Sequence, residues 1–145
     1  MKLTSLVAAS AFALAPISAF ADTIEVQMLN KGDAGAMIFQ PRMVSAAIGD
    51  TVVFVPTDKG HNAETIKGMV PEGQKAFKGK MNKEVSVELT ADGLIGVKCK
   101  PHLGMGMVMV IKVGEVETPD SFLEAKMPKR AKSTFEEILA EGPAS

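Results

Sequence analysis

The stretch that decides how this chain folds is Cys99-Lys100-Pro101-His102-Leu103-Gly104-Met105-Gly106-Met107. It lies between two apolar stretches, one ending at Cys99 and one starting at Met107, whose alternating side chains predict strands. A connection of this length brings the second strand back beside the first. Gly104 and Gly106 permit its tight backbone path, and Pro101 stiffens it. We therefore expect the cysteine, the histidine and a methionine of this 99–107 loop to point into one space between two sheets.

The rest of the chain shows further strand patterns separated by turn residues. Residues 23–29 and 84–90 alternate between apolar and polar side chains, which is typical of half-buried strands. Residues 51–55 are β-branched and aromatic, which favours a strand buried on both faces. Together with residues 93–99 and 107–113 on either side of the loop, these short strands predict an all-β sandwich or barrel.

The C-terminal part has a helical pattern instead. Thr118, Pro119 and Asp120 supply a capping residue, a proline at the first helical position and an acidic first turn. A short helix is expected from there to about Met127, before Pro128. A second, amphipathic helix is predicted from apolar residues spaced on one face, namely Ala131, Phe135, Ile138 and Leu139.

The first 21 residues have the composition of a secretory signal peptide. Lys2 gives a positive start, an apolar stretch follows over residues 3–14, and Ala19-Phe20-Ala21 matches the small-x-small cleavage pattern. The apolar stretch is shorter than the ~20 residues that a membrane span needs. We therefore expect residues 1–21 to be removed and a soluble, exported domain of residues 22–145, without a membrane anchor.

Charge and cysteine content restrict the possible functions. The chain has 16 basic and 17 acidic residues, and loss of Lys2 with the leader leaves 15 and 17, which excludes a globally basic nucleic-acid binder. Cys99 is the single cysteine and has no disulfide partner within the chain. In an exported protein such a cysteine is a free thiol, an intermolecular link or a metal ligand. Because a free thiol is a liability in an oxidising compartment, an occupied cysteine is favoured.

The histidines, the cysteine and one methionine form a candidate metal site. His61 is the one histidine besides His102, and it follows the 51–55 strand, whose end a sandwich can bring beside the 99–107 loop. Two imidazoles, a thiolate and a weak thioether are the ligands of a blue-copper electron-transfer site, whereas thioether is not a usual zinc ligand. We therefore predict one copper ion held by His61, Cys99, His102 and a methionine. Three methionines remain alternatives for the last position: Met105, Met107 and Met109.

These motifs resemble the cupredoxins, and most closely the pseudoazurins among them. The resemblance is carried by Cys-x-x-His-x-x-x-x-Met on a strand–loop–strand, by Gly60-His61-Asn62 upstream and by the helical tail, and it covers essentially all of residues 22–145. It implies an eight-stranded Greek-key β-sandwich with two short C-terminal α-helices. It also implies a type 1 copper that cycles between Cu(I) and Cu(II), with Met107 as axial ligand and Met105 on the loop surface nearby.

The resemblance implies supporting roles for other residues. Asn62 would hydrogen-bond near the thiolate and tie the two ligand segments together. Met37 matches a position that packs against the site, and Pro101 lies in the ligand loop itself. The exposed edge of His102 would be the port through which electrons enter and leave.

A basic surface is expected around the ligands. Residues 59–100 contain eight lysines against five acidic residues, whereas the chain after Gly114 has four basic and seven acidic residues. Such a patch would steer an acidic redox partner, although a solvated lysine face without a partner is the alternative. Lys98 and Lys100 flank the inward-pointing Cys99, so both are expected to point outward on one face. The resemblance implies a ring of lysines around the port, with Met105 beside them: Lys31, Lys59, Lys78, Lys80, Lys98 and Lys100.

We therefore expect a soluble periplasmic electron carrier, monomeric and not an enzyme, that contacts neither nucleic acid nor membrane. The resemblance implies a periplasmic reductase such as copper nitrite reductase as acceptor, and a c-type cytochrome or a dehydrogenase as donor. One alternative is a periplasmic copper chaperone or storage protein, which the run Met105, Met107, Met109 favours but which needs accessible ligands. Another is an enzyme with Cys99 as nucleophile beside a histidine, but the sequence shows no orienting group for it.

Overall fold

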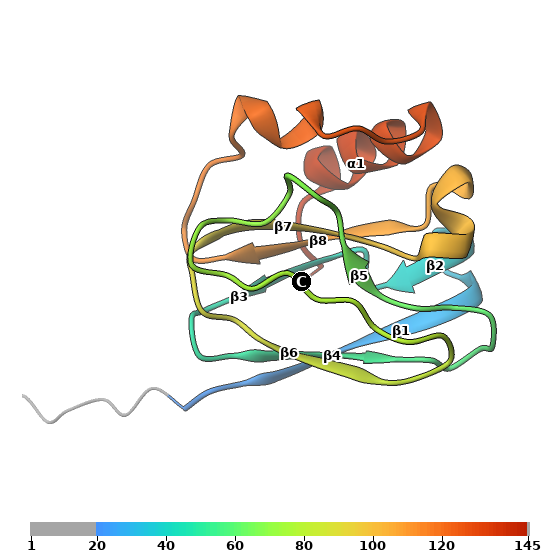
Figure 1. Cartoon of the computed structure of the whole chain (residues 1–145), viewed down its shortest axis with the longest axis horizontal. Coiled ribbons are helices and arrows are strands. Elements are labelled where there is room, and N and C mark those ends of the chain that lie inside the picture. Colours follow the sequence, from blue (N-terminus) through green and yellow to red (C-terminus); the bar gives the residue numbers. More distant parts are fainter. Residues whose placement is uncertain (1–19, 145) are drawn as a thin grey trace, which may run out of the picture.

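Two four-stranded sheets pack face to face in the computed structural model, which describes residues 20–144 (Figure 1). One sheet has the order β2-β1-β4-β6 and the other β3-β8-β7-β5. From β2 to β7, consecutive strands lie in opposite sheets, so the chain repeatedly crosses between the sheets. The pairs β1/β4 and β3/β8 are parallel, and the remaining pairs are antiparallel. The expected all-β Greek-key sandwich is confirmed. Its strands are β1 Thr23–Gly32, β2 Gly35–Gln40, β3 Met43–Ala46, β4 Thr51–Val55, β5 Glu64–Thr65, β6 Val85–Glu88, β7 Gly93–Lys98 and β8 Val108–Val113.

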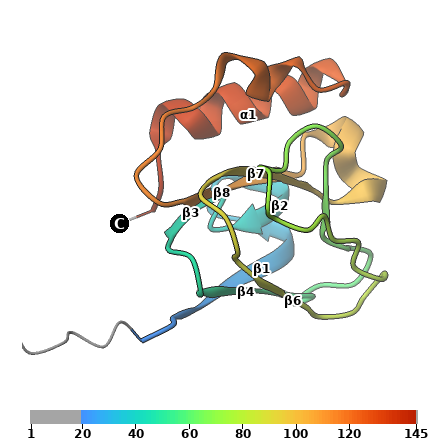
Figure 2. The ribbon, with the colours of Figure 1, turned by 60° about the vertical axis from the view of Figure 1, so that its left-hand side comes forward.

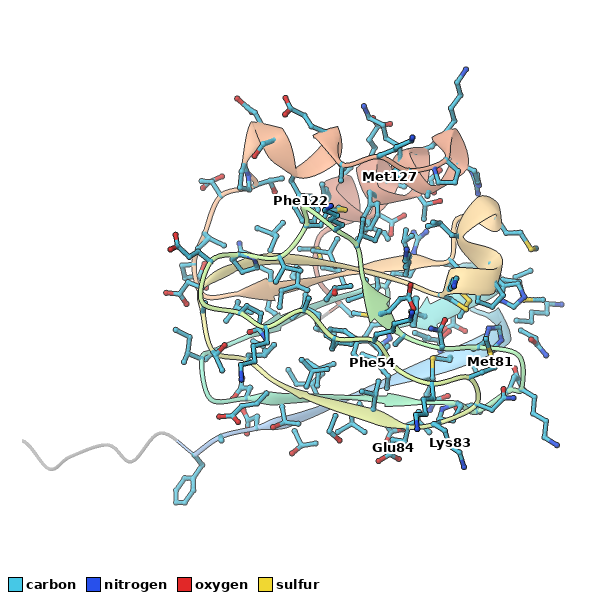
Figure 3. The ribbon with its side chains drawn as sticks, in the orientation of Figure 1. Phe54, Met81, Lys83, Glu84, Phe122 and Met127 are labelled. Atoms are coloured by element: carbon cyan, nitrogen blue, oxygen red, sulfur yellow. The ribbon has the colours of Figure 1, made fainter. Side chains whose placement is uncertain are left out.

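The core between the sheets comes from the predicted alternation. Val26 and Met28 of β1 are fully buried, while Glu25 and Gln27 between them are exposed. Figure 3 shows Phe54 of β4 inside the sandwich, and its ring meets that of Phe39 edge-on at 5.9 Å between centroids. Burying one such aromatic side chain stabilises the fold by roughly 1.5–3 kcal/mol.

The expectation that β4 is buried on both faces was wrong. Val52 and Phe54 are buried, but Val53 and Val55 are only half-buried. The reason is that the C-terminal helices cover the other sheet, which leaves the outer face of the β4 sheet facing solvent (Figure 2). Continuous burial is instead found in β7 and β8, which lie between the sandwich core and those helices.

The helices form a third layer over the β3-β8-β7-β5 sheet (Figure 2). Helix α1, Lys129–Glu141, is the predicted amphipathic helix, and it buries Ala131, Phe135 and Ile138 against the sheet. The other predicted α-helix is a 3₁₀ helix, η2, Asp120–Glu124, whose Phe122 meets Phe135 edge-on. With five residues, η2 is too short to offset the cost of nucleating an α-helix. Pro128 disfavours a helical conformation of the residue before it, so η2 does not extend as a helix as far as Pro128.

Three strands were not identified individually from sequence patterns: β2, β3 and β5. In β2 the neighbouring residues Ile38 and Phe39 are both buried, and Met37 before them has a left-handed φ of 52°, so apolar and polar residues do not alternate. In β5 only two residues pair, which is below the length that a pattern can reveal. Their existence depends on the pairing partners, not on their own sequences.

The start of the described chain is tied to the loop before β4. The Asp22 N–H donates to Asp50 Oδ1 at 2.9 Å, and the Ala47 N–H donates to Asp50 Oδ2 at 2.8 Å. These backbone donors lower the pKa of the Asp50 carboxyl. Most of the predicted signal peptide, residues 1–19, lies outside the described residues. Within residues 20–144, no helix combines the length and the hydrophobicity needed to cross a bilayer.

Candidate metal centre

The 99–107 loop is closed by its own backbone. It contains a 3₁₀ helix, η1, Lys100–Met105, which the sequence did not predict. The Cys99 N–H donates to the Met107 carbonyl at 3.0 Å, and the N–H groups of His102 and Met107 bond to Cys99 O and His102 O at 3.2 Å each. These bonds fix three of the predicted ligand residues relative to one another before any side chain is considered.

Three predicted ligand side chains meet in one place. Cys99 Sγ lies 3.6 Å from His61 Nδ1 and 3.5 Å from His102 Nδ1, and all three ligand atoms fall within 4.8 Å of one another. A metal bound at about 2.0 Å from nitrogen and 2.3 Å from sulfur in a trigonal plane separates those atoms by about 3.7 Å. The spacing therefore fits one ion between them. His61 and Cys99 are fully buried and His102 is half-buried.

Two asparagines that the sequence did not single out hold His61. Its Nε2 lies 2.9 Å from Asn30 Oδ1, at the end of β1, and an amide oxygen can only accept a hydrogen bond. The proton therefore sits on Nε2, and Nδ1 presents its lone pair toward Cys99. Asn82 receives the Gly60 N–H on Oδ1 at 2.6 Å and donates its own N–H to His61 O at 2.8 Å. Both lie too far from His61 in sequence for spacing to reveal them.

The structure separates the three candidate methionines. Met105 on η1 is 54% exposed, whereas Met107 and Met109 are fully buried. Met107 is bonded through its backbone to both Cys99 and His102 and shares their end of the core. Met109 lies further along β8, in register with Val97 inside the sheet. The arrangement favours Met107 as the fourth ligand and leaves Met105 on the surface beside the site.

Asn62 connects the two segments that carry the ligands. Its Oδ1 accepts the Lys100 N–H at 2.8 Å, and its Nδ2 donates to Glu64 Oε2 at 3.1 Å and to Gly79 O at 3.2 Å. Every polar group of this buried side chain is therefore used, and the structure contains the tie that the resemblance implied.

Two further residues assigned by the resemblance lie in different surroundings. Met37 is half-buried and packs against the core cluster that includes Cys99 and Met107. Pro101 is exposed and stands at the start of η1, where its missing N–H leaves no unsatisfied donor. Met37 thus contributes to the apolar wall, and Pro101 contributes to the shape of the loop.

Burial dominates the electrostatics of the site. Burial raises the pKa of the Cys99 thiol, the N–H groups of Asn62 and His102 oppose this, and the charge of Glu64 adds to it. Burial also lowers the pKa of His61, as does the neighbouring His102, while Asp58 opposes the shift. The protein alone therefore favours a neutral imidazole and a neutral thiol, and a metal ion has to displace the thiol proton.

Five of the six lysines in the predicted ring are exposed, and the sixth, Lys98, is paired with a carboxylate. Lys98 is 23% exposed, and its Nζ lies 3.4 Å from Glu64 Oε1, because Lys98 and Glu64 are directly opposite each other in the β5/β7 pair. Lys98 and Lys100, which were expected to point outward together, therefore differ in exposure: Lys100 is exposed on η1, whereas Lys98 is half-buried and faces a carboxylate. The remaining five predicted lysines are exposed: Lys31, Lys59, Lys78, Lys80 and Lys100.

Known proteins are similar to this chain in both sequence and fold. Residues 26–114 match the family model described as copper binding proteins, plastocyanin/azurin family. The pseudoazurin of Paracoccus pantotrophus is 50% identical over 92% of this chain and 94% of its own length. That of Methylorubrum extorquens is 44% identical over 79% and 80%. The crystal structure of native pseudoazurin from Hyphomicrobium denitrificans superposes with a TM-score of 0.76 at 43% identity, covering 84% of this chain and 99% of that one.

The chain therefore belongs to the plastocyanin/azurin family of copper-binding proteins, the cupredoxins, and within it to the pseudoazurins. The His–Cys–His group and the family together support the predicted cofactor, one type 1 copper ion.

Proposed function

We propose that this chain is an exported blue-copper electron carrier that holds one copper ion through His61, Cys99, His102 and Met107. The observation that carries the proposal is the placement of both imidazole Nδ1 atoms within 3.6 Å of a buried Cys99 sulfur. Copper bound there supplies a one-electron couple between Cu(I) and Cu(II). The chain contributes ligands that hydrogen bonds hold in place and an apolar wall that keeps water from becoming a strong ligand.

The same contacts weigh against the two alternatives. A chaperone must hand its metal over, but Cys99, His61 and Met107 are fully buried. A cysteine nucleophile needs an accessible thiolate, but burial raises the pKa of the Cys99 thiol. We therefore propose a carrier, and neither a chaperone nor an enzyme.

Copper addition tests the proposal directly. Protein comprising residues 22–145 should develop an intense blue absorption with one equivalent of Cu(II), and the colour should bleach on reduction and return on oxidation. A colourless complex with Cu(I) alone would support the chaperone instead. Thiol-dependent catalysis without bound metal would support the enzyme.

We propose that the carrier works in the periplasm. The basis is the leader pattern of residues 1–21 and the commitment of the single cysteine to a metal site. The domain of residues 22–145 would then be the exported monomer. Protein sequencing of the exported chain would show Asp22 as its first residue.

We propose further that an acidic redox partner docks where His102 reaches the surface. Each of the five exposed lysines lies within two residues of a proposed ligand or next to a residue that bonds to a ligand or to Asn62. Lys31 follows Asn30, Lys59 lies two residues before His61, Lys78 and Lys80 flank Gly79, and Lys100 follows Cys99. Met105 adds an exposed apolar side chain at the same end. Copper nitrite reductase or another periplasmic reductase fits as acceptor, with a c-type cytochrome or a dehydrogenase as donor.

Charge reversal tests this surface. With an acidic nitrite reductase as acceptor, Lys59→Glu and Lys100→Glu should each slow the second-order electron-transfer rate about tenfold at low salt, because steering weakens. The difference should shrink at high ionic strength. Lys132→Glu on α1, which changes net charge equally, serves as control. Equal slowing by Lys132→Glu would show that net charge alone matters and that no docking surface exists here.

Paired methionine substitutions test the axial ligand. Met107→Leu should retain copper and the blue colour but raise the reduction potential, because loss of the weak thioether donor disfavours the more positive oxidation state. Met105→Leu, on the exposed side of the loop, should leave the potential unchanged. Cyclic voltammetry of both proteins measures this, and the reverse outcome would make Met105 the ligand.

A further inference from the structure

A buried carboxylate stands beside the candidate metal centre without being one of its ligands. Glu64 is 7% exposed, and Asp50 is the other acidic residue that is buried among residues 20–144. The two oxygens of Glu64 have different partners: Oε2 accepts from Asn62 Nδ2 at 3.1 Å, and Oε1 lies 3.4 Å from Lys98 Nζ. A buried charge is costly unless it is paired and hydrogen-bonded, and Glu64 is both.

The sheet register places this pair. Glu64 and Lys98 are opposite each other in the β5/β7 ladder, and Lys98 directly precedes Cys99. On the other side of the carboxylate, Asn62 directly follows His61 and accepts the Lys100 N–H at 2.8 Å. The pair therefore connects with both ligand segments and fixes which way the Asn62 amide points, because a carboxylate can only accept from its NH₂ group.

The charge of Glu64 also acts at the sulfur. Its partners Asn62 and Lys98 directly adjoin His61 and Cys99 in the chain, so its negative charge lies close to the sulfur, and its field there opposes additional negative charge. The same field stabilises added positive charge at that place. The oxidised centre carries one positive charge more than the reduced centre, so a nearby carboxylate stabilises the oxidised form and a nearby ammonium the reduced form.

We propose that Glu64 and Lys98 are positioning residues that orient Asn62 and set the reduction potential of the centre, with Glu64 lowering the potential and Lys98 raising it. The proposal rests on the proposed function, since it assumes that copper occupies the site. The proposal also separates Lys98 from the lysine ring. The charge of Lys98 acts on the reduction potential of the centre, whereas the charges of the other five lysines attract the redox partner.

Two substitutions test the pair by opposite effects. Glu64→Gln removes the charge and keeps an oxygen that can accept from Asn62, so the blue absorption should persist with a reduction potential above that of the wild type. Lys98→Met removes the positive charge and keeps the length of the aliphatic stem, so the potential should fall below that of the wild type. Glu88→Gln, an exposed carboxylate on β6, and Lys132→Met, an exposed lysine on α1, are the matched controls and should leave the potential unchanged.

The outcomes separate the inference from the proposed function. If the wild-type protein does not turn blue with Cu(II), the proposed function fails. If it does, opposite shifts in the two variants support the pair, and no shift in either, or shifts in the same direction, overturn it. Should Glu64→Gln not fold, Lys98→Met decides alone, because a potential equal to or above that of the wild type contradicts the proposal. Thermal melts of the copper-free proteins report any purely structural loss separately.

Salt dependence gives a second, independent readout. The electron-transfer rate of Lys98→Met should keep the wild-type dependence on ionic strength, whereas that of Lys100→Met should become weaker. A weaker dependence in Lys98→Met, as large as that in Lys100→Met, would return Lys98 to the docking surface.

Discussion

We expect the substitution Cys99→Ser to abolish the blue colour of the copper-loaded protein completely. The colour of such a site arises from charge transfer between a cysteine thiolate and Cu(II), and a serine hydroxyl offers neither a soft nor a readily ionised donor. The buried sulfur lies 3.5–3.6 Å from both imidazole nitrogens, so its loss removes the atom that both histidines face. A visible spectrum recorded after addition of one equivalent of Cu(II) measures the effect.

The fold should survive this substitution. Serine is slightly smaller than cysteine, and its buried hydroxyl can donate to one of the adjacent imidazoles, so the loss of stability should stay within about 1–3 kcal/mol. Far-UV circular dichroism and a thermal melt of the copper-free protein serve as controls. A folded Cys99→Ser protein that still turned blue would exclude Cys99 as the ligand and contradict the assignment of the centre.

We also expect the substitution Gly106→Ala to destabilise the protein strongly and to disturb the metal centre. Gly106 ends η1 with a left-handed φ of 84°, and a Cβ there would lie 2.5 Å from Thr134 Oγ1 and 3.2 Å from Arg130 Cγ, both on α1. The left-handed conformation costs a residue with a Cβ about 1–2 kcal/mol, and overpacking costs about 1–3 kcal/mol more. We expect a total loss of roughly 2–5 kcal/mol in the free energy of unfolding, measured by chemical denaturation.

Gly104 supplies the matched control within the same loop. A Cβ at Gly104 would meet no heavy atom within 4 Å, and its φ lies outside the left-handed region. Gly104→Ala should therefore leave both the stability and the blue spectrum close to those of the wild type. Equal destabilisation by the two substitutions would show that flexibility of the loop matters, and not the contact between Gly106 and α1.

The contrast between these glycines also describes the role of the C-terminal helix. Helix α1 packs on the outer face of the sheet that contains β7 and β8, and its residue Thr134 lies against the end of the ligand loop. The tail thus supports the loop from outside while His61 and Asn62 support it from inside. We infer that changes in α1 can reach the metal centre through Gly106 without altering any ligand.

Much of the site could be predicted from the sequence because its residues are close together in the chain or rare in it. Cys99, His102 and Met107 share one loop, and a loop of fixed length between paired strands limits where its side chains can lie. His61 could be added because the chain has just two histidines. The chemistry of two imidazoles, a thiolate and a thioether then indicated copper without any coordinates.

Spacing could not distinguish Met105, Met107 and Met109, because all three lie within reach of the same loop. The structure distinguishes them by burial: Met105 is 54% exposed, and Met109 is committed to the sheet interior. Sequence patterns also missed β5, since two residues pair only because β7 is already in place. That short strand is what sets Glu64 opposite Lys98.

The sequence by itself thus determined the alternating strands, the amphipathic helix and the identity of the ligand loop, because local periodicity and a compact motif are written in neighbouring residues. Only the tertiary structure decided what surrounds the loop. Asn30 holds His61 across 31 residues, Asn62 reaches Lys100 across 38, and Lys98 turns from solvent to Glu64. The contacts of Asn30 and Lys98 depend on sheet register, and a change of one residue in register would send either side chain to the opposite face. The contact of Asn62 depends on packing between distant segments.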